Sequence, residues 1–282
     1  MHRSSILFVT LDSCRYDTFE AADAPRLKAV GPLVRAMAPG YFTYPSHCAM
    51  FMGFTPSVPD GAEPYSNLKI ARIFRLEGGA GRSSRPAFAE LQGASIMDGL
   101  KRLGYLCIGT GSVDWFNPTK PTSRRLVQDF DRYFFPGNCW SLDRQLAFLE
   151  KELEAAGERP VLLFLNLGET HVPYYFEGAD WSSDPESSPC RALSSSNDAV
   201  ECRRRQKACL EFVDGRLGPL LDRFRESNTV ICADHGDAWG EGGLWGHGFH
   251  HPKVVEVPLL FSLRSPPPAA PPKGILSSLL GR

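Results

Sequence analysis

The chain has 282 residues and a formal net charge of −1, from 31 Lys and Arg residues against 32 Asp and Glu residues. This near-neutral balance argues against general nucleic-acid binding, which needs a basic face to neutralise phosphates, but it permits a small anionic substrate. Hydrophobic residues make up 43% of the chain, so it can bury a sizeable core, and whole-chain disorder is excluded.

The first predicted elements are a buried strand and two helices. Residues 5–11 form an apolar run without alternating polar residues, which is typical of a strand covered on both faces. A helix is expected over 25–37, because its opening proline suits a first helical turn. The second helix is short: it begins near Pro45 and stops at Gly53.

In the middle of the chain, a segment without a helix or strand pattern is followed by another predicted helix and strand. Residues 55–90 carry Pro, Gly, Ser and Arg without sustained periodicity, and they predict a long excursion over one edge of the domain. Residues 91–103 predict a helix that ends at Gly104. A second buried strand is expected at 106–110.

The second half of the chain predicts two long helices and three more strands. Residues 141–156 carry apolar side chains at 142, 146, 149 and 153, which lie on one face of a helix. A longer helix over 197–226 is expected to be broken or bent around Gly215 and Gly218-Pro219. The remaining strands are expected at 161–167, 229–233 and 258–261.

The alternation of strands and helices predicts an α/β fold, a three-layer sandwich with a mainly parallel sheet and helices on both faces. The length permits one or two domains, followed by a Pro-rich linker and a short tail at 264–282. No stretch approaches the roughly 20 apolar residues that cross a bilayer, so no membrane partner is expected. The oligomeric state stays open.

Two observations lead us to expect a cytoplasmic location. The first apolar run is too short for a signal-peptide core, and no small-residue cleavage site follows it. The eight cysteines are scattered without a Cys-x-x-Cys pair, which favours free thiols over a disulfide framework.

Five polar residues lie just beyond predicted strands, and a sixth, His247, lies one loop further on. In open α/β sheets, ligands bind beyond the carboxyl ends of the strands, so these side chains are expected to converge at one edge. Carboxylates and imidazoles suit Zn²⁺, Mn²⁺ or a similar divalent ion. Taken singly, such an Asp is more often a helix N-cap and such a His a structural residue. The six residues are Asp12, Glu169, His171, Asp234, His235 and His247.

A hydroxyl group also lies at the predicted start of the short helix. Thr43 or Ser46 could simply cap this helix. The same position favours an anion, because backbone N–H groups and the helix dipole point toward it. A hydroxyl nucleophile needs activation by a base or a metal, and the neighbouring polar cluster would provide it.

Five short blocks, in this order, resemble the signatures of the alkaline phosphatase/sulfatase superfamily. The likeness is closest to its sulfatase-like and phosphoethanolamine-transferase-like branches. The blocks are Val-Thr-Leu-Asp-Ser-Cys-Arg-Tyr-Asp at 9–17, Thr-Tyr-Pro-Ser-His at 43–47, His-Val-Pro-Tyr at 171–174, Ala-Asp-His-Gly-Asp at 233–237 with Gly-His-Gly at 246–248, and Val-Pro-Leu at 257–259.

The resemblance implies a metal-dependent site with a threonine nucleophile. Asp12, Asp234 and His235 would hold a divalent ion, Zn²⁺ or Mn²⁺, and the oxygen of Thr43 would also contact it. We expect one ion at this site, with a second ion as the alternative.

The resemblance also assigns the two remaining histidines. His171 and His247 would contact the oxygens of the transferring group. In two-metal relatives their equivalents hold a second ion together with an acidic residue, which Glu169 would supply here. Relatives usually continue into a smaller C-terminal subdomain, which is expected to be reduced in this chain, so the resemblance implies one catalytic domain over residues 1–263.

Departures from the family pattern indicate the substrate class. Sulfatases carry a Cys or Ser that becomes formylglycine, followed by x-Pro-x-Arg, whereas this chain has Thr43 and His47 at those positions. Threonine cannot form formylglycine but can form a phosphothreonine intermediate. We therefore expect a hydrolase of a phosphate ester, phosphodiester or phosphonate.

Three alternatives remain. The chain could be a sulfatase-like transferase that passes a phosphoryl-linked group to an alcohol. It could also be a sulfuric ester hydrolase, or a degenerate family member that binds a ligand without turnover.

Overall fold

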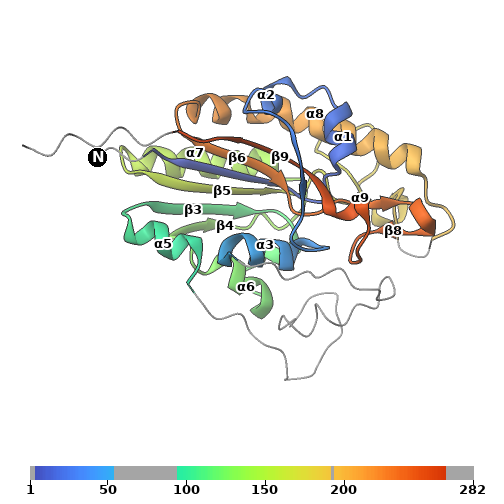
Figure 1. Cartoon of the computed structure of the whole chain (residues 1–282), viewed down its shortest axis with the longest axis horizontal. Helices are drawn as coiled ribbons and strands as arrows, with labels where there is room; N and C mark the ends of the chain where they lie inside the picture. Colours follow the sequence, from blue (N-terminus) through green and yellow to red (C-terminus); the bar gives the residue numbers. More distant parts are fainter. Residues whose placement is uncertain (1–3, 54–93, 192–193, 265–282) are drawn as a thin grey trace, which may run out of the picture.

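The computed structural model describes residues 4–53, 94–191 and 194–264, and its centre is a seven-stranded sheet (Figure 1). The strand order is β2-β9-β6-β1-β5-β3-β4. The strands are β1 (Ile6–Leu11), β2 (Val34–Met37), β3 (Leu106–Gly111), β4 (Arg132–Phe134), β5 (Val161–Leu167), β6 (Asn228–Ala233) and β9 (Glu256–Ser262). Strand β9 is antiparallel to both of its neighbours, and the other adjacent pairs are parallel. The predicted α/β class with a mainly parallel sheet is confirmed.

Helices cover both faces of the sheet, as expected. One face carries α1 (Tyr16–Ala21), α2 (Pro25–Lys28), α7 (Leu142–Ala156) and α8 (Ala199–Arg223). The other carries α3 (Thr43–Met52), α5 (Ile96–Arg102) and α6 (Pro121–Val127). A short helix, α9 (Pro252–Val255), precedes β9, and a small ribbon pairs β7 (Ala238–Trp239) with β8 (Trp245–Gly246).

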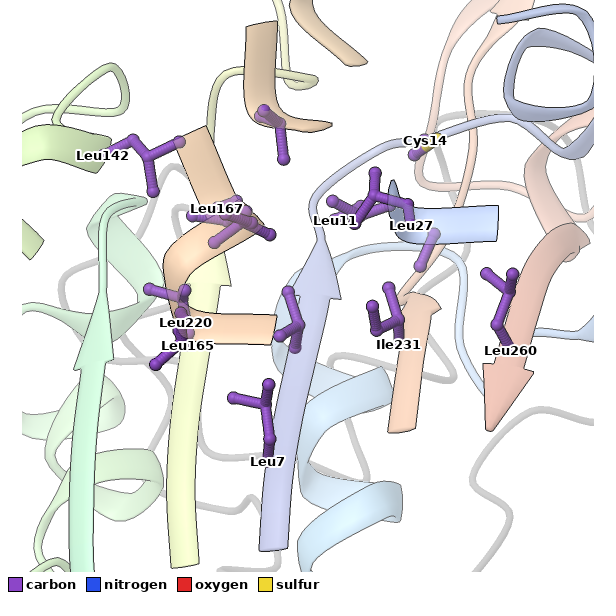
Figure 2. Packing of buried hydrophobic residues seen from close by; sticks show 14 of the residues in the cluster. Leu7, Leu11, Cys14, Leu27, Leu142, Leu165, Leu167, Leu220, Ile231 and Leu260 are labelled. Atoms are coloured by element: carbon purple, nitrogen blue, oxygen red, sulfur yellow. The ribbon is translucent and has the colours of Figure 1, made fainter. Parts of the chain in front are cut away.

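The continuous apolar runs supply a core on each face, because successive side chains of a strand point to opposite sides. In β5, Leu163, Leu165 and Leu167 pack toward α7 and α8, whereas Leu162 and Phe164 pack toward α3 and α6. Figure 2 shows part of the first cluster, with the leucines of β1 and β5 beside Ile231 and Leu260.

The predicted helix over 25–37 is wrong in its second half. Helix α2 ends at Lys28, and Val34–Met37 forms the edge strand β2, which pairs with β9. Pro32 disfavours helical backbone at Gly31. At that glycine the chain lies so close to β9 that a Cβ would sit 2.4 Å from the Phe261 carbonyl oxygen.

The long helix α8 runs without interruption through the residues expected to break or bend it. Pro219 has no N–H to donate to the Gly215 carbonyl, but the Arg26 guanidinium donates to that oxygen at 3.4 Å. A contact from another helix therefore replaces the bond that the proline removes.

Other predictions differ in their bounds or lie outside the described residues. Helix α5 begins at Ile96 after a capping box formed by Ser95 and Asp98. The predicted excursion at 55–90 lies outside the described residues, as does the tail beyond Arg264. Strand β4 and helices α1 and α6 were not predicted. Within the described ranges, no helix is both long and apolar enough to cross a membrane.

The close contact between β3 and the Phe116 ring gives a stability prediction. A Cβ on Gly111 would lie 2.4 Å from Cγ of Phe116, a fully buried side chain. We expect Gly111→Ala to lower the free energy of unfolding by about 1–3 kcal/mol in urea unfolding. Gly99 on α5 has open space at its Cβ position, so Gly99→Ala should raise the same quantity by up to about 1 kcal/mol. Equal stability of the two variants would contradict this account.

Candidate active site

The register of the three central strands places the first site residues side by side. Leu11 at the end of β1 pairs with both Leu167 of β5 and Ala233 of β6. The next residues, Asp12 and Asp234, therefore leave the sheet at the same level. The parallel sheet is the reason that carboxylates more than 220 positions apart in the sequence meet.

Four predicted residues converge at this edge, and each is at most 1% exposed. The Thr43 hydroxyl, at the start of α3, lies 3.3 and 3.5 Å from the two Asp12 carboxylate oxygens and 3.4 Å from His235 Nε2. His235 Nε2 lies 3.7 Å from Asp12 Oδ1 and 3.6 Å from Asp234 Oδ2. The hydroxyl thus faces a cluster of two carboxylates and one imidazole.

The donor set fits a divalent cation. Asp12, Asp234 and His235 are one of two groups in the described chain whose ligand atoms lie within 4.8 Å of one another. Oδ1 of Asp234 accepts from the backbone N–H groups of Ser13 and His235, but Oδ2 is buried without a hydrogen-bond partner among the described residues. A cation would satisfy that oxygen, since buried polar atoms normally have a partner.

Electrostatics supports the same interpretation. Burial, together with the neighbouring Asp12 carboxylate, raises the pKa of Asp234. Two carboxylates in one buried site need a positive charge to remain ionised together. Burial, together with nearby His247, lowers the pKa of His235 to about 3, so its imidazole is neutral, which is the form that binds metals.

Further side chains hold Asp12 in place. Its Oδ2 accepts a hydrogen bond from Asn166 Nδ2 at 3.3 Å, and its carbonyl oxygen accepts one from the Thr170 hydroxyl at 2.7 Å. Asn166 lies on β5, the strand next to β1, so the sheet itself fixes the orientation of the carboxylate. The sequence analysis did not identify this support.

His47 holds Thr43 in place from within α3. Its Nδ1–H donates to the Thr43 carbonyl at 2.8 Å, and its Nε2 lies 3.0 Å from the Thr10 hydroxyl. The ring is fully buried and packs edge-on to Phe116 and Phe164. Burial lowers its pKa to about 4, so the imidazole is neutral at ordinary pH. His47 therefore positions Thr43 and brings no positive charge to the site.

His171 and His247 lie beside this cluster. The His247 ring centre is 4.3 Å from that of His235 and 5.5 Å from that of His171. His247 Nδ1 lies 2.6 Å from a carboxylate oxygen of Asp237. Asp237 had been given no role, although it closes the Ala-Asp-His-Gly-Asp block. With His235 and His247 it forms the second group of close ligand atoms.

Glu169 is in neither group of close ligand atoms among the described residues, and its place at a second ion stays a prediction. Its Oε1 accepts from the backbone N–H groups of Ser141 and Leu142 at 3.0 and 2.9 Å. It therefore caps α7, whose N-terminus offers unpaired donors and a positive dipole end. Its other oxygen is buried without a partner among the described residues.

This cap predicts a pH effect on stability. Burial raises the pKa of Glu169 to about 7, although the N–H donors of Ser141 and Leu142 favour the ionised form. Between about pH 4.5 and 7, the folded state holds a proton that the unfolded state has released, so stability falls as pH rises through this range. The glutamine side chain of Glu169→Gln does not titrate, so the variant does not lose stability in this way as pH rises. We therefore compare the free energy of unfolding of Glu169→Gln with that of wild type. The difference, variant minus wild type, should increase by about 3 kcal/mol as pH rises from about 4.5 to 7.

The measurement is urea unfolding of the metal-free protein at pH values on either side of that range. Comparing the two proteins cancels the titration of every other group. A difference that stays constant with pH would contradict the assignment.

Comparisons with known proteins address the fold. No protein-family model matches the chain, and no curated protein matches it in sequence. Solved structures do match it. One is the C-terminal periplasmic domain of phosphoethanolamine transferase EptC from Campylobacter jejuni, with 16% identity, a TM-score of 0.62, and coverage of 93% of this chain and 80% of that one.

A second match is a protein in the alkaline phosphatase superfamily from Vibrio parahaemolyticus. Its identity is 16% and its TM-score 0.55, over 94% of this chain and 61% of that one. The fold is alkaline-phosphatase-like.

A third structure with this fold contains a metal. The C-terminal periplasmic domain of EcEptC from Escherichia coli, solved in complex with Zn, matches with 14% identity and a TM-score of 0.61. The match covers 93% of this chain and 73% of that one. Identities this low establish the shared fold alone.

Proposed function

We propose that this protein is a metal-dependent hydrolase of a phosphate ester, phosphodiester or phosphonate, with Thr43 as the nucleophile. The observation that carries the proposal is the position of the Thr43 hydroxyl, 3.3–3.5 Å from Asp12 and His235 at the start of α3. A helix start favours an anionic group, and phosphoryl transfer depends mainly on positioning and charge stabilisation.

In the proposed reaction, the Thr43 hydroxyl releases its proton to water, its oxygen forms a bond to phosphorus, and the bond from phosphorus to the leaving oxygen breaks. Asp12 accepts the hydrogen bond of the Thr43 hydroxyl and directs the oxygen toward the substrate. A divalent cation held by Asp12, Asp234 and His235 would lower the pKa of that hydroxyl and offset negative charge on the transferring group. The phosphothreonine formed in this way is then cleaved by water.

The two partly exposed histidines complete the mechanism. Nδ1 of His171 bonds to the Val172 carbonyl and Nδ1 of His247 bonds to Asp237, so each ring keeps Nε2 for other contacts. These Nε2 atoms are suited to contact the phosphoryl oxygens or to protonate the leaving oxygen.

A transferase is the second candidate, because phosphoethanolamine transferases are among the solved structures that share the fold. Here an acceptor alcohol would replace water in the second step. A sulfuric ester hydrolase has less support, since Thr43 cannot become formylglycine and His47 is neutral and buried where sulfatases carry an arginine.

The test is a substrate screen with Zn²⁺- and with Mn²⁺-loaded protein. The panel contains an aryl phosphate, a phosphodiester, a phosphonate and an aryl sulfate, each with and without an added alcohol. Turnover of a phosphorus ester supports the proposal, and transfer of the group to the alcohol would indicate the transferase. Stoichiometric metal without any turnover would favour a ligand-binding protein, and sulfate turnover alone would overturn the assignment.

A cytoplasmic location is part of the proposal. It is supported by the eight cysteines, which are all free, as expected in a reducing compartment. The EptC structures that share the fold are periplasmic domains, so the compartment needs its own test. Fractionation of the natural host, with detection of this chain in each fraction, would decide between the two.

A further inference from the structure

We propose that Asp237 and Tyr174 are positioning residues that fix the imidazole of His247. We also propose that Asp237 and His247 do not bind a second metal ion. The inference deepens the proposed function and rests on it, because His247 then faces the transferring phosphoryl group. Its basis is that both oxygens of the Asp237 carboxylate take part in hydrogen bonds.

The Asp237 side chain is fully buried, and both of its carboxylate oxygens are in use. Oδ1 lies 2.6 Å from His247 Nδ1, and Oδ2 accepts the hydroxyl hydrogen of Tyr174 at 2.7 Å. A histidine whose Nδ1–H donates to a carboxylate has a fixed ring orientation, with Nε2 left to act on another group. The arrangement is that of an oriented imidazole.

Tyr174 is itself held on both sides. Its hydroxyl oxygen accepts from the Trp239 indole N–H at 2.7 Å, and its backbone carbonyl accepts from the Trp181 indole N–H at 2.8 Å. Its backbone has φ of +56°, which is uncommon for a bulky residue. Strained backbone of this kind persists where the surroundings over-determine it, and it often occurs at functional sites.

Arg15 contacts both Asp237 and Trp239. Its guanidinium donates to the Asp237 carbonyl at 3.2 Å and stacks on the Trp239 ring at 4.2 Å. The side chain is only 1% exposed, and its charge is balanced by ion pairs with Asp17 and Glu241. A charge this well paired is suited to fixing the loop and not to binding substrate.

These contacts also explain why Asp237 and His247 belong to a group of close ligand atoms. Their 2.6 Å separation is that of a charge-assisted hydrogen bond. A cation between them would have to displace the proton on His247 Nδ1 and compete for a carboxylate that Tyr174 already contacts. The geometry is satisfied without an ion.

The test compares Asp237→Asn and Tyr174→Phe with two matched controls. Tyr133→Phe removes a partly buried hydroxyl that donates to the Phe116 carbonyl, and Asp214→Asn alters a buried carboxylate that accepts from the Leu27 N–H. Among the described residues, these two hydrogen bonds run to Phe116 and Leu27, which are not site residues. If Asp237→Asn does not fold, Tyr174→Phe carries the same test.

Proton NMR of the Zn²⁺-loaded protein is the first readout. A far-downfield resonance from His247 Nδ1–H is expected in wild type, assigned by its loss in His247→Ala. Asp237→Asn should remove it from that region and Tyr174→Phe should move it, whereas both controls should leave it unchanged. An unchanged resonance in Asp237→Asn and Tyr174→Phe would overturn the proposal.

Metal content and kinetics are the second and third readouts. Asp237→Asn should retain the wild-type Zn²⁺ stoichiometry, and loss of one equivalent would overturn the proposal in favour of a second ion. Where the wild type turns over, both variants should lower kcat by about 10–100-fold with KM changed much less.

The readouts separate the two claims. If the wild type shows no turnover but the NMR pattern and the Zn²⁺ stoichiometry are as expected, the proposed function is refuted and the positioning roles of Asp237 and Tyr174 are supported. If Asp237→Asn and Tyr174→Phe both show normal turnover and an unchanged resonance, their positioning roles are refuted, whereas the proposed function is not.

Discussion

Replacing Thr43 with alanine is expected to lower kcat by at least about 10³-fold, as removal of a catalytic nucleophile does in other covalent mechanisms. The change deletes the attacking oxygen and leaves the side chains of Asp12, Asp234 and His235 in place. Metal content should therefore stay at the wild-type value while turnover of the best phosphorus ester disappears. Initial rates and metal analysis on the same preparation measure both.

Thr43→Ser is the matched control, because it keeps the hydroxyl and removes only a methyl group. It should retain most of the activity that the alanine variant loses. In wild type, acid quenching during turnover followed by mass spectrometry should find phosphate on Thr43. Full activity of Thr43→Ala would overturn the nucleophile assignment, and equal loss in the alanine and serine variants would point to a packing defect.

The convergence of Asp12 and Asp234 could be predicted from the sequence because it depends on local patterns. Continuous apolar runs identify strands buried on both faces, and strands of parallel sheets have this pattern. Strand β9 carries the same pattern but is antiparallel to both of its neighbours, so the run alone does not set the direction. Parallel strands end at one edge of the sheet, so the residue that follows each strand is placed without any knowledge of long-range contacts. For the same reason, the three central strands are found close to their predicted bounds.

Elements that depend on distant partners could not be predicted in this way. Strand β2 is short and mostly exposed, and its backbone bonds come from β9, more than 200 positions later. The continuity of α8 past Pro219 depends on Arg26, which belongs to another helix. In each case the decisive contact is absent from the local pattern.

The same limit applies to individual site residues. The position of Glu169 after a strand is compatible with metal binding, but the start of α7 lies nearby and takes its carboxylate as a cap. The contacts of Asp237 come from Tyr174, 63 positions away in the sequence, and from His247 in the next loop. The sequence placed these side chains at the correct edge, and their competing partners determined their roles.

Removing the divalent cation is the second large effect that we expect. Without it, Asp12 and Asp234 are two carboxylates in a fully buried site, and Oδ2 of Asp234 has no partner among the described residues. At a free metal concentration about 1,000 times Kd, binding to the folded state alone stabilises it by roughly 4 kcal/mol. A chelator should therefore lower the Tm of the wild type, and added Zn²⁺ or Mn²⁺ should restore it.

Asp234→Asn makes this prediction sharper, because its effect should change sign with metal. In the chelated state the variant should be more stable than wild type by about 1–3 kcal/mol, since it removes a carboxyl group that burial beside Asp12 makes costly to ionise. With metal present, wild type should be the more stable protein, because the variant has lost a charged ligand. Asp214→Asn alters a carboxylate on α8 that bonds to the Leu27 N–H, so this variant should show the wild-type response to metal. Stability curves for wild type and Asp234→Asn that keep the same order with and without metal would rule out Asp234 as a ligand.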